Sequence, residues 1–234
     1  MKLCYALWGD GLGPVLLGPE FRAALAAAGA TMLQVNVDDA DVAAAKLRIT
    51  TFDTPVSALV SVWTGGNHEG ISAVVAGAGA AGAGAVRTAE RSAGWEVEER
   101  VPLAPPVTPD GERWPALAQV GFLRIPADLD EREWRHRWQG SHTNVAIATQ
   151  ATFGYIQNRV LRTIMGSDRV DAVVEELFPM AAISDIHAFY GSGGDDAELR
   201  RRLGLMLESV TRFGAHENLD IVPTSRYVWT LAAG

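Results

Sequence analysis

The sequence predicts an α+β fold made of two tandem ferredoxin-like units, each with the element order β-α-β-β-α-β. The same order of strand and helix patterns occurs in both halves of the 234 residues, a proline-rich segment separates the halves, and 48% hydrophobic residues suffice for a core. The chain divides into an N-terminal unit (1–103), a linker (104–115) and a C-terminal unit (116–234). Because such a sheet carries helices on one face only, we expect the two bare faces to pack together as a barrel-type core.

The alternation of side chains in strands, and the proline and glycine residues at helix ends, define the elements of the first half. Residues 2–8 alternate as in a strand with at least one buried face, and Cys4 is a small core residue within it. The run at 19–28 has a proline near its first turn and Gly29 after its end, which is typical of a short helix. The other expected elements are strands at 31–37, 56–63 and 95–103 and a helix within 86–92.

The second half repeats this order. A strand at 116–125 is closed by Pro126, and a long helix follows at 128–150. Another helix covers 197–213, with a core stripe made of Leu199, Leu203, Met206, Leu207 and Val210. Further strands are expected at 151–163, 170–178 and 219–229, and a short helical segment at 180–190.

The composition disfavours several classes of function. A formal net charge of -8 and a pI of about 5.1 are unsuited to nucleic acid and to anionic membrane surfaces. The chain has one cysteine, so no intramolecular disulfide can form. No stretch reaches the roughly 18 apolar residues of a membrane span, and the first residues lack the apolar run of a signal peptide. We expect a soluble cytoplasmic protein that binds neither nucleic acid nor membranes.

The helix at 128–150 carries the most informative pattern. Asp130 is a candidate N-cap, followed three residues later by a glutamate as in a capping box. Trp134, Trp138 and His142 then recur on one helical face. Indoles belong in a core, whereas an imidazole among them needs a partner and has a perturbable pKa. Either this is a core helix with a hydrogen-bonded histidine, or it lines a pocket in which His142 faces a ligand.

Polar residues on the next strand could complete such a pocket. Tyr155 and Gln157 share one face of that strand and Asn158 lies on the other, so the three cannot all face one cavity. Their simpler role is packing on the sheet surface.

Two neighbouring carboxylates interrupt the apolar strand at 170–178. Glu175 and Glu176 must point in opposite directions, and an inward carboxylate is costly unless it is paired. Its partner could be His142 or Arg124. A salt bridge at the sheet edge is the simpler interpretation.

The second half resembles the EthD family, part of the dimeric α+β barrel superfamily. The matching residues are the strand end FLRIP at 122–126 and the helix that follows it, in which Trp138 stands four positions before His142. Glu133 and Trp134 match the acidic-aromatic start of the family's helix.

The resemblance covers roughly residues 116–229 and implies the fold more firmly than a reaction. The family often has a proline soon after the histidine, whereas Thr143, Asn144 and Val145 stand here, so we expect the helix to continue. The superfamily includes polyketide cyclases and dehydratases, monooxygenases, lyases, isomerases and haem-dependent enzymes.

We predict a cofactor-independent lyase, dehydratase or cyclase that acts on an apolar aromatic or polycyclic small molecule. The barrel would hold the ligand between tryptophans, and His142 would move a proton with help from Tyr155 or an inward carboxylate. No metal or cofactor is expected. The expected catalytic residues are His142, Tyr155 and Glu175, and the expected substrate-binding residues are Trp134, Trp138, Arg124, Gln157 and Asn158.

Several alternatives stay open. The same pocket could bind a small molecule without chemistry, or a histidine could be the axial ligand of a haem. Residues 77–82 fit GxGxxG, but the next strand has acids along its length, so low-complexity sequence accounts for the match better than a nicotinamide site. Asp185 and His187 could be two metal ligands, although a capping aspartate and a surface histidine are simpler. The second half could also pair with another chain in a homodimer.

Overall fold

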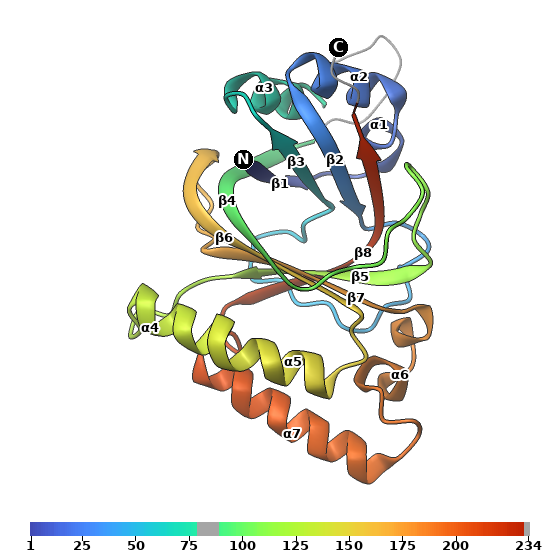
Figure 1. Ribbon diagram of the computed structural model, residues 1–234, viewed down its shortest axis with the longest axis vertical. Coiled ribbons are helices and arrows are strands. Elements are labelled where there is room, and N and C mark those ends of the chain that lie inside the picture. Colours follow the sequence, from blue (N-terminus) through green and yellow to red (C-terminus); the bar gives the residue numbers. More distant parts are fainter. Residues whose placement is uncertain (79–88, 232–234) are drawn as a thin grey trace.

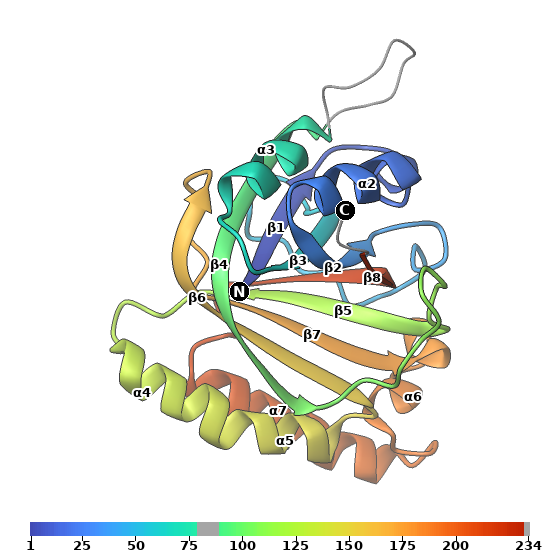
Figure 2. The same ribbon diagram turned by 45° about the horizontal axis from the view of Figure 1, so that its top comes forward.

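The computed structural model describes residues 1–78 and 89–231, and the strands in this part of the chain form one closed antiparallel barrel (Figures 1 and 2). The strands are β1 (Lys2–Trp8), β2 (Ala30–Val37), β3 (Ala58–Thr64), β4 (Arg91–Leu103), β5 (Ala116–Leu123), β6 (Gly154–Met165), β7 (Ala172–Pro179) and β8 (Leu219–Thr230). Their order around the barrel is β1-β3-β2-β8-β5-β7-β6-β4. A closed barrel has no edge strand that could recruit another chain.

The two halves of the chain meet along two seams. At one seam β2 pairs with β8, for example Val35 with Tyr227, and at the other β4 pairs with β6, for example Val97 with Val160. Within the halves the strand orders are β4-β1-β3-β2 and β8-β5-β7-β6. Each half therefore supplies four adjacent strands, and neither four-stranded sheet closes by itself.

Helices lie on two opposite sides of the barrel, which forms the middle layer (Figure 1). The first half supplies α1 (Gly13–Leu16), α2 (Pro19–Ala27) and α3 (Glu69–Gly77). The second half supplies α4 (Glu131–Arg135), the π-helix η1 (His136–His142), α5 (Thr143–Thr149), the 3₁₀ helix η2 (Met180–Ile183), α6 (Ile186–Tyr190) and α7 (Asp196–Arg212). Among the described residues, no helix is both long and apolar enough to cross a bilayer.

Side chains alternate between the barrel interior and the two helical layers, as the period of two in a strand requires. Trp95, Phe122 and Val222 belong to the interior core, which draws residues from both halves. Leu33 packs under the helices of the first half, and Phe178 packs under those of the second. Both faces of most strands are therefore covered.

The barrel interior also contains a buried polar cluster around Glu175. Its carboxylate accepts hydrogen bonds from Gln34 Nε2 at 2.9 Å and Asn36 Nδ2 at 2.7 Å, and Arg226 Nε lies 3.2 Å away. These partners satisfy a charge that would otherwise be costly to bury. The ligand was expected inside the barrel, but packed apolar side chains and this cluster occupy the interior.

Two expected elements differ from the structure, and one short helix is not among the expected elements. The helix expected within 86–92 is wrong in its described part, since β4 begins at Arg91, and the helix that precedes β4 is α3. Residues 86–88 lie outside the described residues. The helix expected at 128–150 exists as one helical run, but its middle is π-helical. The short helix α1 lies between the strand expected at 2–8 and the helix expected at 19–28, where no element is expected.

Candidate functional site

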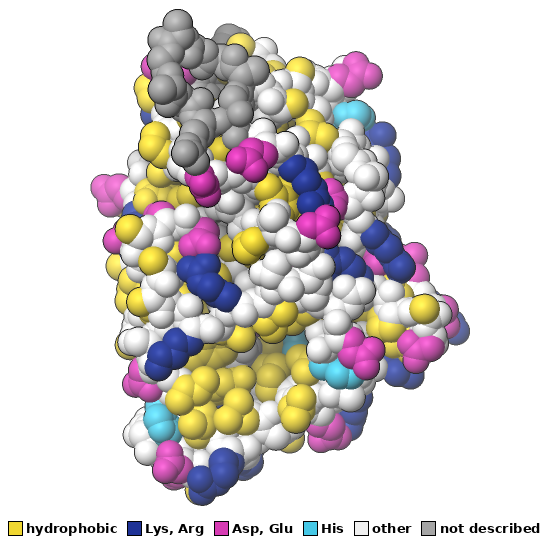
Figure 3. Space-filling view, turned by 180° about the vertical axis from the view of Figure 1, so that it is seen from behind, with side chains coloured by type: hydrophobic (Ala, Val, Ile, Leu, Met, Phe, Trp, Pro, Cys, Tyr) yellow, Lys and Arg dark blue, Asp and Glu magenta, His cyan; other side chains and the backbone are white. Residues whose placement is uncertain are grey.

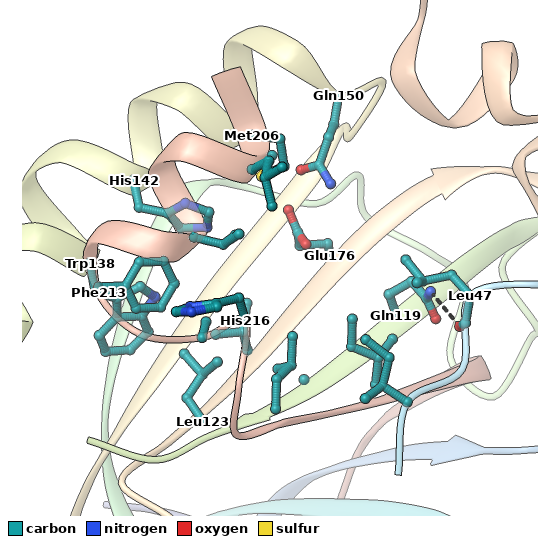
Figure 4. A pocket seen from close by; sticks show the side chains of 18 of the residues that line it. Leu47, Gln119, Leu123, Trp138, His142, Gln150, Glu176, Met206, Phe213 and His216 are labelled. Carbon is teal, nitrogen blue, oxygen red and sulfur yellow. Dashed lines mark hydrogen bonds between the residues drawn. The ribbon is translucent and has the colours of Figure 1, made fainter. Parts of the chain in front are cut away.

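A cavity of about 520 Å³ lies between the outer face of the second half's sheet and the helices that cover it (Figure 4). We call it the sheet–helix cavity. Strands β5, β6, β7 and β8 contribute to its floor, and η1, α6 and α7 contribute to its walls. Most of its lining is apolar, including Trp138, Val174, Met206 and Phe213. The polar side chains are Thr51, Gln119, His142, Gln150, Tyr155, Glu176, Tyr190, His216 and Glu217.

His142 reaches the cavity from the end of η1. Asp130 caps this helical run, accepting a hydrogen bond from Glu133 N at 2.9 Å, as the capping box predicts. The run then widens into π turns, which occur frequently at functional sites. His142 is buried, and its ring packs 4.6 Å from that of Phe213, centroid to centroid.

The imidazole of His142 has one hydrogen-bond partner among the described residues. Its Nδ1 lies 3.0 Å from Ser209 Oγ on α7, whereas Nε2 has no protein partner there. Burial lowers the pKa of His142 from 6.5 to about 4, because the cation would lose its hydration. The ring is therefore neutral at pH 7 and can accept a proton at one nitrogen.

Three neighbouring strands place polar side chains in one row on the cavity floor. Glu176 of β7 lies opposite Gln119 of β5 on one side and opposite Tyr155 of β6 on the other. Gln119 donates a hydrogen bond from Nε2 to the carbonyl oxygen of Leu47 at 3.1 Å. The row belongs to the outer face of the barrel, because Glu175, the neighbour of Glu176, points inward.

Among the described residues, no cationic side chain pairs with the Glu176 carboxyl group. Its Oε1 is buried and has no hydrogen-bond partner among the described residues. Burial raises the pKa of Glu176 from 4.5 to about 7. Burial also raises the pKa of the Tyr155 hydroxyl, and the Glu176 charge adds to that rise. A carboxyl with this pKa can give or take a proton near neutral pH.

The first half of the chain contributes a wall to the cavity. Ile49, in the loop between β2 and β3, forms an isolated bridge with Ile221 of β8. The carboxylate of Asp220 holds the same loop, since it accepts a hydrogen bond from Thr51 Oγ1 at 2.8 Å and pairs with Arg124 Nη1 at 2.7 Å. The sheet–helix cavity lies mostly in the second half of the chain, and loop residues from the first half complete it.

The cavity opens to the surface beside α7, where hydrophobic side chains surround a hollow (Figure 3). Leu203 is 37% exposed and Leu207 is 62% exposed, although both were expected in the core stripe of α7. Leu199 and Met206 of the same stripe are buried. Sequence periodicity identifies the apolar face of a helix, but it cannot tell a packed core from the wall of a cavity.

Three of the residues expected in the site line the sheet–helix cavity: Trp138, His142 and Tyr155. They come from η1 and β6, and they meet because the helical run crosses the outer face of the sheet. In Figure 4, Trp138 and His142 lie at one end of the cavity, with Glu176 farther along its floor.

The other expected residues do not line this cavity. Glu175 and Asn158 are buried on the inward face of the barrel, and Asn158 donates to Val173 O at 3.2 Å. Trp134 packs against Trp138 in a tilted arrangement, with ring centroids 4.9 Å apart.

Gln157 and Arg124 have structural partners instead. Gln157 faces the helical layer and donates to Thr143 Oγ1 at 2.9 Å. Arg124 pairs with Asp220, and its guanidinium lies 4.3 Å from the centre of the Phe52 ring.

Sequence reasoning missed several residues of the site. The predicted site contains Glu175 and not Glu176, because alternation alone cannot show which of the two faces a cavity. Gln119 is the polar residue in the otherwise apolar strand ALAQVGFL, so the sequence alone could have indicated it as a site residue. Ser209 and the loop residues Leu47 and Ile49 gave no comparable signal, because the tertiary structure brings them to the site.

The GxGxxG match and the pair Asp185 and His187 are not part of the sheet–helix cavity in the described residues. Gly77 is the last residue of α3, whereas Gly79 and Gly82 of the match lie outside the described residues. Asp185 caps α6 by accepting a hydrogen bond from His187 N at 2.8 Å. In residues 1–78 and 89–231, no three His, Cys, Asp or Glu side chains are grouped as metal ligands.

Solved structures of other proteins share this architecture. One described as an "anthrone oxidase-like protein" matches with a TM-score of 0.54 at 11% identity, over 100% of this chain and 93% of that one. A mutant chlorite dismutase from Candidatus Nitrospira defluvii, in complex with cyanide, matches with a TM-score of 0.53 at 10% identity, over 96% and 90%. No protein-family model and no curated protein matches the sequence. At these identities the likeness shows the fold alone, a closed antiparallel barrel with helices outside it.

Proposed function

We propose that this protein is a cofactor-independent enzyme that moves a proton on an apolar aromatic or polycyclic small molecule held in the sheet–helix cavity. The observation that carries the proposal is the presence of His142 and Glu176 in one largely apolar cavity. A volume of about 520 Å³ suits a molecule of a few fused rings. The pKa values of about 4 and about 7 make both groups neutral in mildly acidic solution.

In this proposal His142 is the general base. If Nδ1 donates its hydrogen to Ser209 Oγ, the lone pair of Nε2 is left to accept a proton from the substrate. Ser209 then fixes both the tautomer and the orientation of the ring. The apolar surroundings keep the ring neutral until it takes that proton.

Protonated Glu176 would stabilise the negative charge that develops on a substrate oxygen. A carboxylic acid kept neutral by an apolar site can donate a hydrogen bond to an enolate or phenolate oxygen. Tyr155 lies opposite Glu176 in the same row, and its raised pKa keeps its hydroxyl protonated as a second donor. The base and the donors together suit removal of a proton next to a carbonyl group.

That proton transfer is the first step of several reactions. The first candidate is the lyase, dehydratase or cyclase reaction that the sequence predicts. The second candidate is an oxidation, because one solved structure with the same fold is described as anthrone oxidase-like. An oxidation by the protein alone would consume dioxygen, whereas the other three reactions would not. An oxygen electrode distinguishes the two classes.

The lining of the cavity fits haem poorly. His142 could act as an axial ligand, but haem propionates require cationic or hydrogen-bonding partners. The carboxyl groups of the lining are those of Glu176 and Glu217, and none of the described lining residues is Lys or Arg. Two acids and no fixed cation disfavour a dianionic macrocycle.

The experiment that tests the proposal compares two histidines of one helical run on a panel of fused-ring ketones and phenols. His142→Ala should abolish turnover, whereas His136→Ala should retain it, because His136 is exposed and lies outside the cavity. Circular dichroism shows whether each variant is folded. Unchanged turnover by folded His142→Ala would contradict the mechanism. Ligand binding without conversion, with equal affinity in His142→Asn, would instead identify a carrier protein.

We also propose that the halves are tandem ferredoxin-like units, 1–103 and 116–234, joined by residues 104–115, and that the second is EthD-like. The matching strand orders of the two halves support the first part. The helix with Trp138 and His142 beside the cavity supports the second.

A further inference from the structure

Gly121, in the middle of β5, lacks a side chain where the protein itself does not require a glycine. Its strand pairs with β7 and β8 in continuous register through this position. Its φ is not among the positive values that favour glycine. A Cβ built there would lie 3.7 Å from Leu219 Cδ1, 3.8 Å from Asp220 O and 3.9 Å from Val174 Cβ, which are ordinary van der Waals contacts.

Gly94 of β4 shows what a glycine required by packing looks like. A Cβ at Gly94 would lie 2.6 Å from Cδ1 of the Tyr5 ring, so any side chain would force a core residue to move. No such neighbour stands over Gly121. Glycine inside a strand is normally unfavourable, and it often marks a place where a ligand approaches the backbone.

The free space above Gly121 is the sheet–helix cavity. Gly121 lines its floor, and Gln119 and Leu123 line it on either side along the same face of β5. The backbone of β5 is partly accessible at Gly121, although helices cover this face of the barrel. The floor is therefore a shallow trough, with the polar row of Gln119 and Glu176 at one end and Leu123 at the other.

We propose that Gly121 is the residue that selects ligands by size and shape, and that it admits a flat, fused-ring phenol or ketone lying directly against the backbone of β5. The inference rests on the proposed function and specifies its substrate class. A flat fused-ring system needs the space above Gly121 to lie against the sheet, whereas a single ring fits in the rest of the cavity without using that space. The ligand oxygen would face Glu176 and the hydrocarbon rings would cover Gly121.

The test measures binding by isothermal titration calorimetry with two probes, phenol and 9-phenanthrol. Gly121→Val should weaken 9-phenanthrol binding by about tenfold or more, because its methyl groups overlap the space of the outer rings. Phenol binding should change by less than about twofold, since one ring leaves that space empty. The midpoint of thermal unfolding should stay the same or rise, because valine is favoured in strands.

Two further variants separate a ligand role from a structural one. Gly121→Ala should fold as well as the unchanged protein and weaken 9-phenanthrol binding less than Gly121→Val does. Gly94→Ala, the packing control, should lower the midpoint of unfolding. A destabilised Gly121→Ala would show that Gly121 is structural and would overturn the inference.

The outcomes also separate this inference from the proposed function. If the unchanged protein binds 9-phenanthrol and Gly121→Val binds both probes with the same ratio of affinities, the role of Gly121 is wrong and the proposed function stands. If the unchanged protein binds neither probe, the proposed ligand class is wrong, and the role of Gly121 is wrong with it.

Discussion

At the scale of residues, His142 and Glu176 are shifted in opposite directions by the same physical cause. Loss of hydration disfavours the charged form of each group, so the pKa of the imidazole falls to about 4 and that of the carboxyl rises to about 7. Between these values one group is a neutral base and the other a neutral acid. An apolar cavity with two such groups is suited to proton transfer and poorly suited to binding a charged ligand.

The first prediction concerns the pH dependence of kcat/KM. Activity should rise as pH increases through about 4, where His142 loses its proton, and should fall through about 7, where Glu176 loses its own. Glu176→Gln keeps a hydrogen-bond donor but cannot ionise, so the fall near pH 7 should disappear. Activity that instead rises through pH 7 and vanishes in Glu176→Gln would make Glu176 the base and contradict the assigned roles.

The second prediction concerns stability. The folded-state pKa of Glu176 is raised, so its contribution is most favourable below about pH 4.5 and is lost as pH rises through about 7. Glu176→Gln should therefore increase the free energy of unfolding at pH 8 by roughly 1–3 kcal/mol and change it little at pH 4.5. Urea denaturation at the two pH values measures this difference. An equal effect at both pH values would show that ionisation of the Glu176 carboxyl does not lower the free energy of unfolding.

At the scale of elements, the site depends on how the loop between β2 and β3 is fastened to the second half. Asp220 is 1% exposed and accepts hydrogen bonds from the loop at Thr51, while its charge is compensated by Arg124. Removing one member of a buried ion pair leaves the other without a partner. The wall formed by Leu47 and Ile49 is thereby coupled to an ion pair outside the cavity.

The third prediction follows from this coupling. Asp220→Ala should lower the free energy of unfolding by about 3 kcal/mol and should also weaken ligand binding. Glu208→Ala is the matched control, because its partner Arg212 is an exposed side chain one turn away on α7, and it should cost less than about 0.5 kcal/mol. Equal effects of the two substitutions in urea denaturation would show that the loop is held by other contacts.

The elements also show what the sequence could and could not reveal. Period-two alternation and caps such as Asp130 predicted most strands and helices. They could not decide between Glu175 and Glu176, because both faces of β7 are covered, one by the barrel and one by helices. The π turns of η1 could not be predicted from the sequence either, because helices are recognised by a period of 3.6 residues.

At the scale of the whole molecule, one chain supplies both halves of a barrel. The expected union of two sheets is present, but the apolar core and polar cluster inside it serve the fold, and the cavity lies outside it under the helices of the second half. Sequence patterns identify which faces are apolar, whereas the location of a cavity depends on how far apart packed layers stand. A homodimer stays a prediction.

The fourth prediction concerns the second half by itself. A fragment of residues 116–234 would expose the free edges of β6 and β8 and the inward side chains Val120, Phe122 and Val173. It should therefore self-associate or remain unfolded, because an open sheet with a bare apolar face is not stable in water. Size-exclusion chromatography with circular dichroism measures this. A folded monomeric fragment would show that the two halves are independent.

A crystal structure of the protein with bound 9-phenanthrol would locate the ligand directly. We predict density for the three rings between α7 and the floor formed by β5 and β7, with the hydroxyl group within hydrogen-bonding distance of Glu176 and one ring edge facing His142. Density for the compound inside the barrel, or its absence from the sheet–helix cavity at saturating concentration, would contradict the proposed site.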